Sequence, residues 1–191
     1  MNVALIWDHL SLVLSALILA VGVGVPLGLL AYLFPRFGKA ILWVVDLIQT
    51  VPALALLGII MVVMDPGSPT AVIGLTLYSL LPIVRNTSLG LSQVPEHLKE
   101  AATGMGMSGT YRLLHVEVPL AVPMLVTGIR IAAVNAIGTA VFASFVGGGG
   151  LGGLFYTAIR QENMGMIFVG TLVLMVMAFV LDAGLSYMEH R

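Results

Sequence analysis

Apolar residues run through most of this chain in long unbroken stretches. Asp, Glu, Lys and Arg are absent from residues 10–35, 47–64, 66–84, 131–159 and 163–181. A backbone in hydrocarbon must pair its own polar groups, so a spanning segment is either a helix or a strand of a closed barrel. Barrel strands alternate apolar and polar residues over about ten positions, a pattern that these stretches lack. The stretches therefore predict helices.

A spanning helix needs about 20 mostly apolar residues, and five stretches meet this length once their flanks are included. The expected spans are residues 10–34, 40–64, 69–91, 119–145 and 163–187. The chain is thus predicted to be an all-α integral membrane protein that forms a single transmembrane domain. Five helices make too small a bundle to enclose a pathway, so we expect a dimer.

Composition excludes several other classes of protein. Hydrophobic residues make up 59% of the chain and charged residues only 9%, against roughly a quarter charged in a soluble domain. With eight basic residues and a net charge of −1, there is no basic face for nucleic acid. Cysteine is absent and the four histidines are dispersed, so we expect no metal, no other cofactor and no catalytic site in this chain.

Basic residues predict the orientation, because they favour the cytoplasmic side. They flank the connection between the first two spans and follow the third span: Arg36, Lys39, Arg85, Lys99 and Arg112. The N-terminus is therefore expected outside and the C-terminus in the cytoplasm. The first span is expected to be retained, because no Lys or Arg precedes it and it exceeds the h-region of a signal peptide.

The one long polar connection, residues 94–118, predicts a short helix across the cytoplasmic face. Pro95 suits a first helical turn, and one apolar stripe follows it: Leu98, Ala101, Ala102 and Met105. Ser108 is expected to cap a second short helix, and Pro119 to open the next span. From the residues alone, this helix either binds a partner or rests on lipid head groups.

A motif within this connection favours the partner. The connection matches the pattern E-A-A-x3-G-x9-I-x-L-P, with Val replacing both Ile and Leu. The matching residues are Glu100-Ala101-Ala102, then Gly106 after three residues, then Val116-Glu117-Val118-Pro119 after nine more. This resembles the coupling loop of permease subunits of binding-protein-dependent ABC importers. The resemblance implies that the helix docks in a groove of a cytoplasmic ATP-binding subunit, which holds ATP and Mg²⁺. The residues it assigns to ATPase coupling are Glu100, Ala101, Ala102, Gly106 and Pro119.

Four further segments, residues 49–57, 81–87, 128–130 and 147–152, look like those of the glycine betaine/carnitine/choline permeases. The resemblance implies the five-helix, methionine-permease-like fold of type I importers, a quaternary-ammonium osmoprotectant as substrate, and a separate extracytoplasmic binding protein. It leaves open whether the second half is a copy or a related permease. The alternatives are an importer of the same class for an amino acid or related molecule, and a gradient-driven secondary transporter.

Five residues are candidates for the gate or the pathway. Pro52 predicts a kink in span two, where Gln49 and Thr50 can satisfy the freed carbonyls; a gate hinge and a static packing kink both fit. Arg130 lies well inside span four, so it should face the bundle interior or an aqueous path, with backbone carbonyls or Asp46 as partner. We expect a structural or gating role for Arg130 rather than substrate binding. Asn135 continues its polar side.

Two other patterns predict little chemistry. The glycine run 147–153 lacks the Lys of a phosphate-binding loop and is read as a tight re-entry between spans. The scattered aromatic residues suggest no aromatic cage for a quaternary ammonium, which we expect in the binding protein instead.

Overall fold

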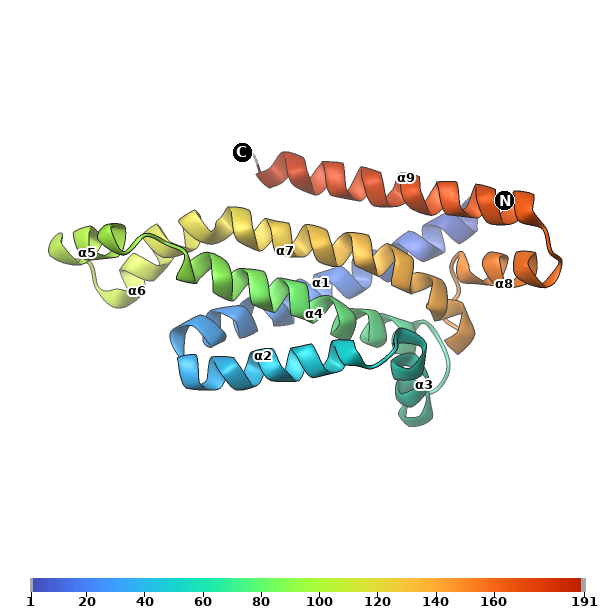
Figure 1. The fold of residues 1–191 in the computed structure, drawn as a ribbon, viewed down its shortest axis with the longest axis horizontal. Helices are drawn as coiled ribbons and strands as arrows, with labels where there is room; N and C mark the ends of the chain where they lie inside the picture. Colours follow the sequence, from blue (N-terminus) through green and yellow to red (C-terminus); the bar gives the residue numbers. More distant parts are fainter. Residues whose placement is uncertain (1, 190–191) are drawn as a thin grey trace.

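Helices make up all the regular structure that the computed structural model describes, which covers residues 2–189. In chain order they are α1 (Val3–Leu33), α2 (Pro35–Thr50), α3 (Ala53–Val63), α4 (Ser68–Ser92), α5 (Glu96–Gly104), α6 (Gly109–Arg112), the π-helical η1 (Leu113–Glu117), α7 (Val118–Thr139), the 3₁₀-helical η2 (Ala140–Val146), α8 (Gly152–Arg160) and α9 (Met164–Glu189). Figure 1 shows α5 and α6 extending beyond the long helices at one end, with α3 and α8 near the other.

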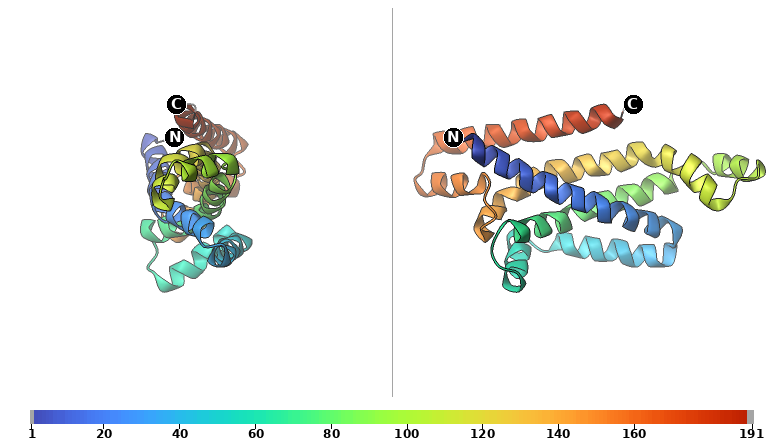
Figure 2. Two further views of the ribbon diagram at one scale, coloured as in Figure 1. Left: turned by 90° about the vertical axis from the view of Figure 1, so that its left-hand side faces the viewer. Right: turned by 180° about the vertical axis from the view of Figure 1, so that it is seen from behind.

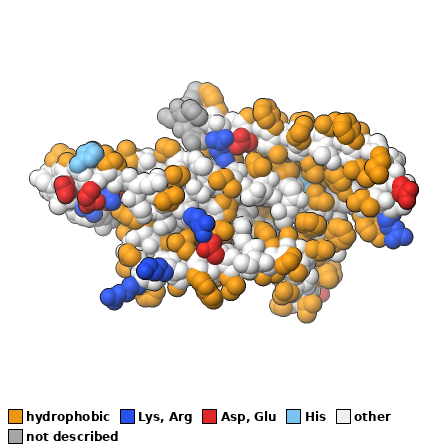
Figure 3. All heavy atoms as spheres, in the orientation of Figure 1, with side chains coloured by type: hydrophobic (Ala, Val, Ile, Leu, Met, Phe, Trp, Pro, Cys, Tyr) orange, Lys and Arg blue, Asp and Glu red, His pale blue; other side chains and the backbone are white. Residues whose placement is uncertain are grey.

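Four helical stretches are long and apolar enough to cross a membrane: Val3–Leu33, Ser68–Ser92, Gly109–Val146 and Met164–Tyr187. The pair α2–α3 makes a fifth candidate span, which bends by 100° at its break. The predicted all-α membrane fold is therefore confirmed. Hydrophobic side chains cover much of the face shown in Figure 3, whereas charged side chains gather at its ends and at two points between them.

The core lies where α1, α4 and α7 cross, as the view from behind in Figure 2 shows. Small residues bring these helices together, as is typical in membranes. A Cβ at Gly28 of α1 would lie 2.5 Å from the Thr87 Cβ of α4, and one at Gly128 of α7 would lie 2.7 Å from the carbonyl oxygen of Pro82. Ala132 and Ala133 of α7 are fully buried in the same core. The backbones therefore approach closely.

Helix boundaries differ from the expected ranges in four places. Helix α2 begins at Pro35, before residue 40. Helix α1 begins at Val3, before residue 10. The fourth long helix begins at Gly109 rather than at Pro119 and runs continuously to Val146. Helix α8, which was not predicted, follows the glycine run. It is amphipathic, and Arg160 at its last position, with Glu162 in the turn that follows, made this segment resemble an ordinary loop.

The glycine run forms the tight turn between η2 and α8. Gly147, Gly149 and Gly150 have φ angles of +76°, +82° and +78°, a region that other residues rarely adopt. His9 of α1 is fully buried beside this turn. Its Nε2 donates to the carbonyl of Ile137 at 3.0 Å, and its Nδ1 accepts from the N–H of Leu151 at 3.3 Å. The turn is therefore fixed to α1.

Close packing at Gly28 generates a prediction with a control on the same helix. Gly28→Ala places its Cβ against Thr87 and should destabilise the protein by about 1–3 kcal/mol through overpacking. Gly22→Ala meets nothing within 4 Å and should leave stability unchanged or slightly raised. Thermal unfolding of the two variants in the same detergent measures the difference. Equal melting temperatures would contradict the close contact between α1 and α4.

Candidate functional site

Two short helices, α5 and α6, carry the residues that the resemblance assigns to ATPase coupling. Pro95 stands immediately before α5 as its N-cap, and Gly106 turns the chain after α5 with a φ of +81°. The Ser108 side chain caps α6, accepting a hydrogen bond from the N–H of Tyr111 at 3.4 Å. The predicted serine cap is confirmed. The two helices thus form a compact hairpin at one end of the bundle.

The coupling candidates on α5 face in two directions. Ala102 is buried, with 1% of its surface exposed, and holds α5 to the rest of the protein. Glu100 and Ala101 are exposed, as is Gly106 at the turn. An alanine beside a carboxylate on an open helix face lets another backbone approach closely. The outward face of α5 is therefore suited to contact with a second polypeptide.

Glu117, which the motif included without a role, is the most buried charged residue in the described part of the chain. Only 1% of its surface is exposed. The Tyr32 hydroxyl donates to its Oε2 at 2.5 Å, and the Arg112 Nε donates to its Oε1 at 2.7 Å. These charge-assisted bonds offset the cost of burying the carboxylate. Glu117 therefore joins the end of α1 to α6 and η1.

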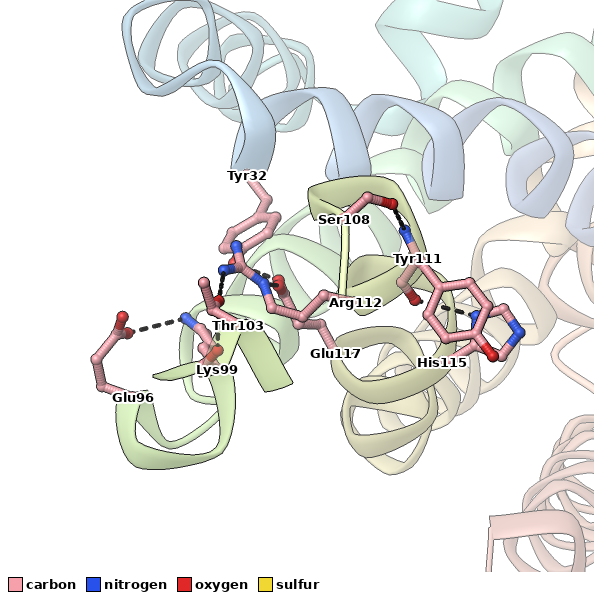
Figure 4. Close-up of polar contacts among 9 residues, drawn as sticks. All are labelled: Tyr32, Glu96, Lys99, Thr103, Ser108, Tyr111, Arg112, His115 and Glu117. Atoms are coloured by element: carbon pink, nitrogen blue, oxygen red, sulfur yellow. Dashed lines mark hydrogen bonds and ion pairs between the residues drawn. The ribbon is translucent and has the colours of Figure 1, made fainter. Parts of the chain in front are cut away.

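Arg112 extends this connection to α5. Its Nη1 donates to the Thr103 hydroxyl at 3.0 Å, and that hydroxyl donates to the carbonyl of Lys99 at 2.8 Å. Tyr32, Thr103, Arg112 and Glu117 form a continuous set of contacts, shown in Figure 4, which we call the Glu117 network. Through it, a helix at the end of the molecule contacts α1 and the base of α7.

Lys99 adds a second contact between α5 and α1. Its side chain is only 12% exposed, and its Nζ lies 3.4 Å from Glu96 and 5.7 Å from the centroid of the Tyr32 ring. Burial lowers the pKa of Lys99, but contacts with Tyr32 and Glu96 outweigh burial, so the net pKa lies above its ordinary value. Lys99 is therefore protonated at physiological pH, as a cation–π contact requires.

Pro119 lies in the first turn of α7, as expected, but the helical run begins earlier, at Gly109, and passes through η1 into α7 without a break. Pro119 has no N–H to donate to the carbonyl of His115, four residues earlier. The helix widens just before it, and the Val118 N–H bonds the Leu113 carbonyl in the π-helical pattern. Such π-helical turns are frequent at functional sites. Here the turn contains Glu117.

At the α2–α3 break, polar side chains pair the carbonyls that helix breaks leave free. The Thr50 hydroxyl donates to the carbonyl of Leu47 at 2.7 Å, and the Tyr78 hydroxyl donates to that of Val51. Gln49 differs from expectation, because its Nε2 donates at 2.7 Å to the carbonyl of Tyr78. That carbonyl lies four residues before Pro82, so Gln49 compensates for a proline in α4 rather than for Pro52.

A cavity of about 390 Å³ brings two of the pathway candidates together. Gln49 of α2 and Asn135 of α7 both line it, together with Tyr78 and Phe142. Thr50 and Pro52 do not line it; they lie at the bend beside it. None of the residues lining this cavity is charged.

Arg130 pairs with Asp182 of α9, so the suggested partner Asp46 is wrong. The Arg130 Nε donates to Asp182 Oδ1 at 2.9 Å and an Nη to Oδ2 at 3.1 Å. Asp46 instead accepts from Arg85, at 2.6 and 2.9 Å. Arg130 and Asp182 line a second cavity, of about 370 Å³, that shares Asn135 with the first. The polar side predicted for α7 therefore continues from Arg130 to Asn135.

The burial of Glu117 predicts a large effect on stability. Glu117→Ala leaves the Arg112 guanidinium and the Tyr32 hydroxyl without their acceptor and should cost about 3 kcal/mol, or about 6–12 °C in melting temperature. Glu100→Ala removes an exposed carboxylate and should change the melting temperature little. Thermal unfolding in detergent measures both. A Glu117→Ala variant as stable as Glu100→Ala would contradict the network.

Comparisons with known proteins identify the family. The model described as "binding-protein-dependent transport system inner membrane component" matches residues 20–191. The carnitine transport permease protein OpuCB of Listeria monocytogenes is 37% identical over 185 residues, covering 97% of this chain and 85% of the relative. The osmoprotectant import permease protein OsmW of Salmonella typhimurium is 39% identical over 193 residues, covering 98% and 88%.

A third relative, the glycine betaine/carnitine/choline transport system permease protein OpuCB of Bacillus subtilis, is 35% identical over 184 residues, covering 96% of this chain and 85% of the relative. Among solved structures, an inward-facing form of the MetNI methionine ABC transporter matches with a TM-score of 0.87 at 21% identity, covering 96% of this chain and 92% of that chain. This likeness confirms the methionine-permease-like fold. The chain therefore belongs to the binding-protein-dependent transport system inner membrane components: it is the multi-pass permease subunit of an ABC importer, a system that also comprises an ATPase and a binding protein.

Proposed function

We propose that this permease forms half of the membrane pathway for a quaternary-ammonium osmoprotectant: glycine betaine, carnitine or choline. The observation that carries the proposal is the match over nearly the whole chain to relatives named for these solutes. The solutes in these names, glycine betaine, carnitine and choline, are all small quaternary-ammonium cations or zwitterions. An amino acid or a related small molecule, delivered by another binding protein, is the alternative.

The α5–α6 hairpin is the proposed ATPase-coupling element. Exposed Glu100 and Ala101 meet the groove of the ATP-binding subunit, and buried Ala102 seats α5 on its own protein. Gly106 sets the turn that the hairpin needs, and Pro119 sustains the π-helical turn that contains Glu117. When the ATPase subunits close, the Glu117 network passes the displacement of α5 to α1 and α7. Packed elements with two arrangements can carry such motion across a membrane.

The bend at Pro52 is the proposed gate. Gln49, Thr50 and Pro52 lie where α2 meets α3, next to the cavity that Asn135 lines. A break of 100° held by side-chain hydrogen bonds changes shape more readily than a continuous helix. Arg130 fixes α9 to α7 through Asp182, which supports a structural or gating role rather than substrate binding.

A second permease, identical or related, is proposed to complete the pathway. The polar cavities lie on the outer surface of this bundle, and Arg130 and Asp182 in the second are 25% and 38% exposed. Such charges in contact with hydrocarbon are costly, which supports a partner chain or an aqueous path beside them. The remaining apolar surface faces lipid.

We propose that the α5 end lies in the cytoplasm, with the N-terminus outside and the C-terminus inside. The start of α2, which carries Arg36 and Lys39, lies at the same end of the molecule as α5 and α6, which carry Lys99 and Arg112 (Figure 1). This distribution follows the positive-inside tendency.

Substitutions in the coupling element should separate uptake from insertion. In the complex with its ATPase and binding protein, Glu100→Ala and Gly106→Val should lower glycine betaine uptake to below about a tenth of the wild-type rate, because few interface residues carry most of the binding energy. Gly106→Asn, which tolerates a positive φ, should retain more uptake than Gly106→Val. Detergent-extracted protein levels should stay equal to wild type. Normal uptake by Glu100→Ala and Gly106→Val would refute the coupling role.

The same purified complex tests the substrate. Glycine betaine, carnitine or choline should stimulate ATP hydrolysis when the binding protein is present, whereas an amino acid such as methionine should not. Stimulation by the amino acid alone would refute the osmoprotectant and favour the alternative.

Single-cysteine labelling tests the orientation, because the natural chain has no cysteine. Ile159 on α8 and Met105 after α5 are 63% and 71% exposed, at opposite ends of the molecule (Figure 1). Ile159→Cys should react with a membrane-impermeant maleimide in intact spheroplasts, and Met105→Cys only after permeabilisation. The reverse pattern would invert the proposed topology.

A further inference from the structure

Three aromatic side chains form a row at the α8 end of the molecule. Phe142 and Phe145 lie on η2 and Tyr156 lies on α8; their ring centroids are separated by 6.4 Å and then 5.9 Å. The Phe145 and Tyr156 rings meet edge to face, at 88°. All three side chains remain exposed, at 37%, 50% and 49%. We call Phe142, Phe145 and Tyr156 the aromatic row.

The outer end of the row already contacts a cation. The Arg160 guanidinium lies 5.8 Å from the centroid of the Tyr156 ring, and its Nη1 donates to the Tyr156 hydroxyl at 3.3 Å. Aromatic faces attract cations through the negative charge density above the ring. The Tyr156 ring is therefore placed and exposed so that a cation can contact it.

The inner end of the row opens into the uncharged cavity. Phe142 lines that cavity with Gln49 and Asn135. The amide of Gln49 holds the Tyr78 carbonyl through one N–H, and the exposed amide of Asn135 faces the same space. The row thus runs from the surface near α8 to a cavity that offers amide groups and no formal charge.

A solute with a quaternary ammonium group and a carboxylate matches these two features, the aromatic row and the amide-lined cavity. The quaternary ammonium group has no N–H and cannot donate a hydrogen bond from its nitrogen, so aromatic faces are its characteristic partners in proteins. The carboxylate of a betaine, in turn, accepts hydrogen bonds from amide N–H groups. A neutral lining also avoids trapping the solute, which must leave after it enters.

We propose that the aromatic row and the Gln49–Asn135 cavity form a transit site, in which Phe142, Phe145 and Tyr156 bind the quaternary ammonium group of the solute by cation–π contacts. This inference rests on the proposed function, because it names residues of this chain that recognise the proposed substrate. It departs from the expectation that the aromatic residues of this chain offer no such site, because the fold brings together rings from η2 and α8. The contrasting explanation is an aromatic belt, in which rings at a helix end anchor the protein to lipid head groups.

The two explanations differ in what they require of the rings. An anchoring ring needs its size and amphipathic character, whereas a cation–π ring needs electron density on its face. Progressive fluorination of phenylalanine withdraws that density and leaves the shape nearly unchanged. A graded loss of transport with fluorination at Phe142 or Phe145 is therefore specific to cation binding.

The experiment measures initial uptake of radiolabelled glycine betaine by proteoliposomes that contain the complete complex and saturating loaded binding protein. Phe142→Leu and Phe145→Leu should each lower the rate about fivefold, as the loss of one cation–π contact predicts. Phe145→Tyr, which keeps an aromatic face, should stay within about twofold of wild type. The matched control is Phe179→Leu on α9, whose ring is 71% exposed and lies outside the row; it should transport at the wild-type rate.

Fluorinated phenylalanines at position 145 complete the test. The uptake rate should fall stepwise with each added fluorine, while the ATPase activity that the loaded binding protein stimulates stays within about twofold of wild type, because coupling is untouched. Unchanged uptake in both leucine variants, or rates independent of fluorination, would overturn the transit site while leaving the proposed function intact. A wild-type complex that imports no quaternary ammonium solute would overturn both.

Discussion

The buried carboxylate of Glu117 is the contact on which the arrangement of the α5 end depends. It accepts hydrogen bonds from Tyr32 of α1 and Arg112 of α6 while it lies in the π-helical turn that leads into α7. Removing one member leaves another buried polar group without a partner, which is far more costly than the net value of the bonds. The Glu117 carboxylate therefore links the hairpin to α1 and to the start of α7.

A second constraint acts along the rest of the bundle, because a membrane offers no water to unpaired carbonyls. Proline in a long helix frees the carbonyl four residues before it, and a helix break frees others. Gln49 bonds the Tyr78 carbonyl, which Pro82 leaves without its helical donor, and the Thr50 hydroxyl bonds the Leu47 carbonyl at the α2–α3 break. Side-chain hydrogen bonds exchange partners more easily than a helix ladder does. The same residues that make the breaks tolerable therefore make these points deformable.

Much of the fold was predictable because it follows from local patterns. Apolar runs without charge predict helices wherever they are long enough, and Ser108 caps α6 as its type and position suggest. The 100° break at Pro52 follows from the missing N–H of proline, although its size does not. Helix α8 was missed because its nine residues begin with two glycines and end at Arg160, and a short amphipathic segment is hard to distinguish from a loop.

The site was less predictable because its contacts join distant positions. Glu117 meets Tyr32 across 85 positions, and Arg130 meets Asp182 across 52. No periodicity encodes such pairs. The sequence held one signal for each pair. Glu117 is flanked by valines on both sides. Asp182 stands at the end of one apolar run and Arg130 stands within another apolar run. A charge in apolar surroundings implies a partner of opposite charge, but only the fold determines which residue that partner is.

A neutral cavity in the permease is consistent with solute capture by the binding protein and solute passage through the permease. Strong recognition belongs to a partner that must capture a dilute solute, whereas a transit site must bind weakly enough for release. Arg130 and Asp182 satisfy each other through two hydrogen bonds, so their charges are largely cancelled beside the path. In the proposed transit site, the amides of Gln49 and Asn135 and the ring of Phe142 are then the groups available to the solute. Weak, non-ionic contacts of this kind lower the barrier to passage without creating a trap.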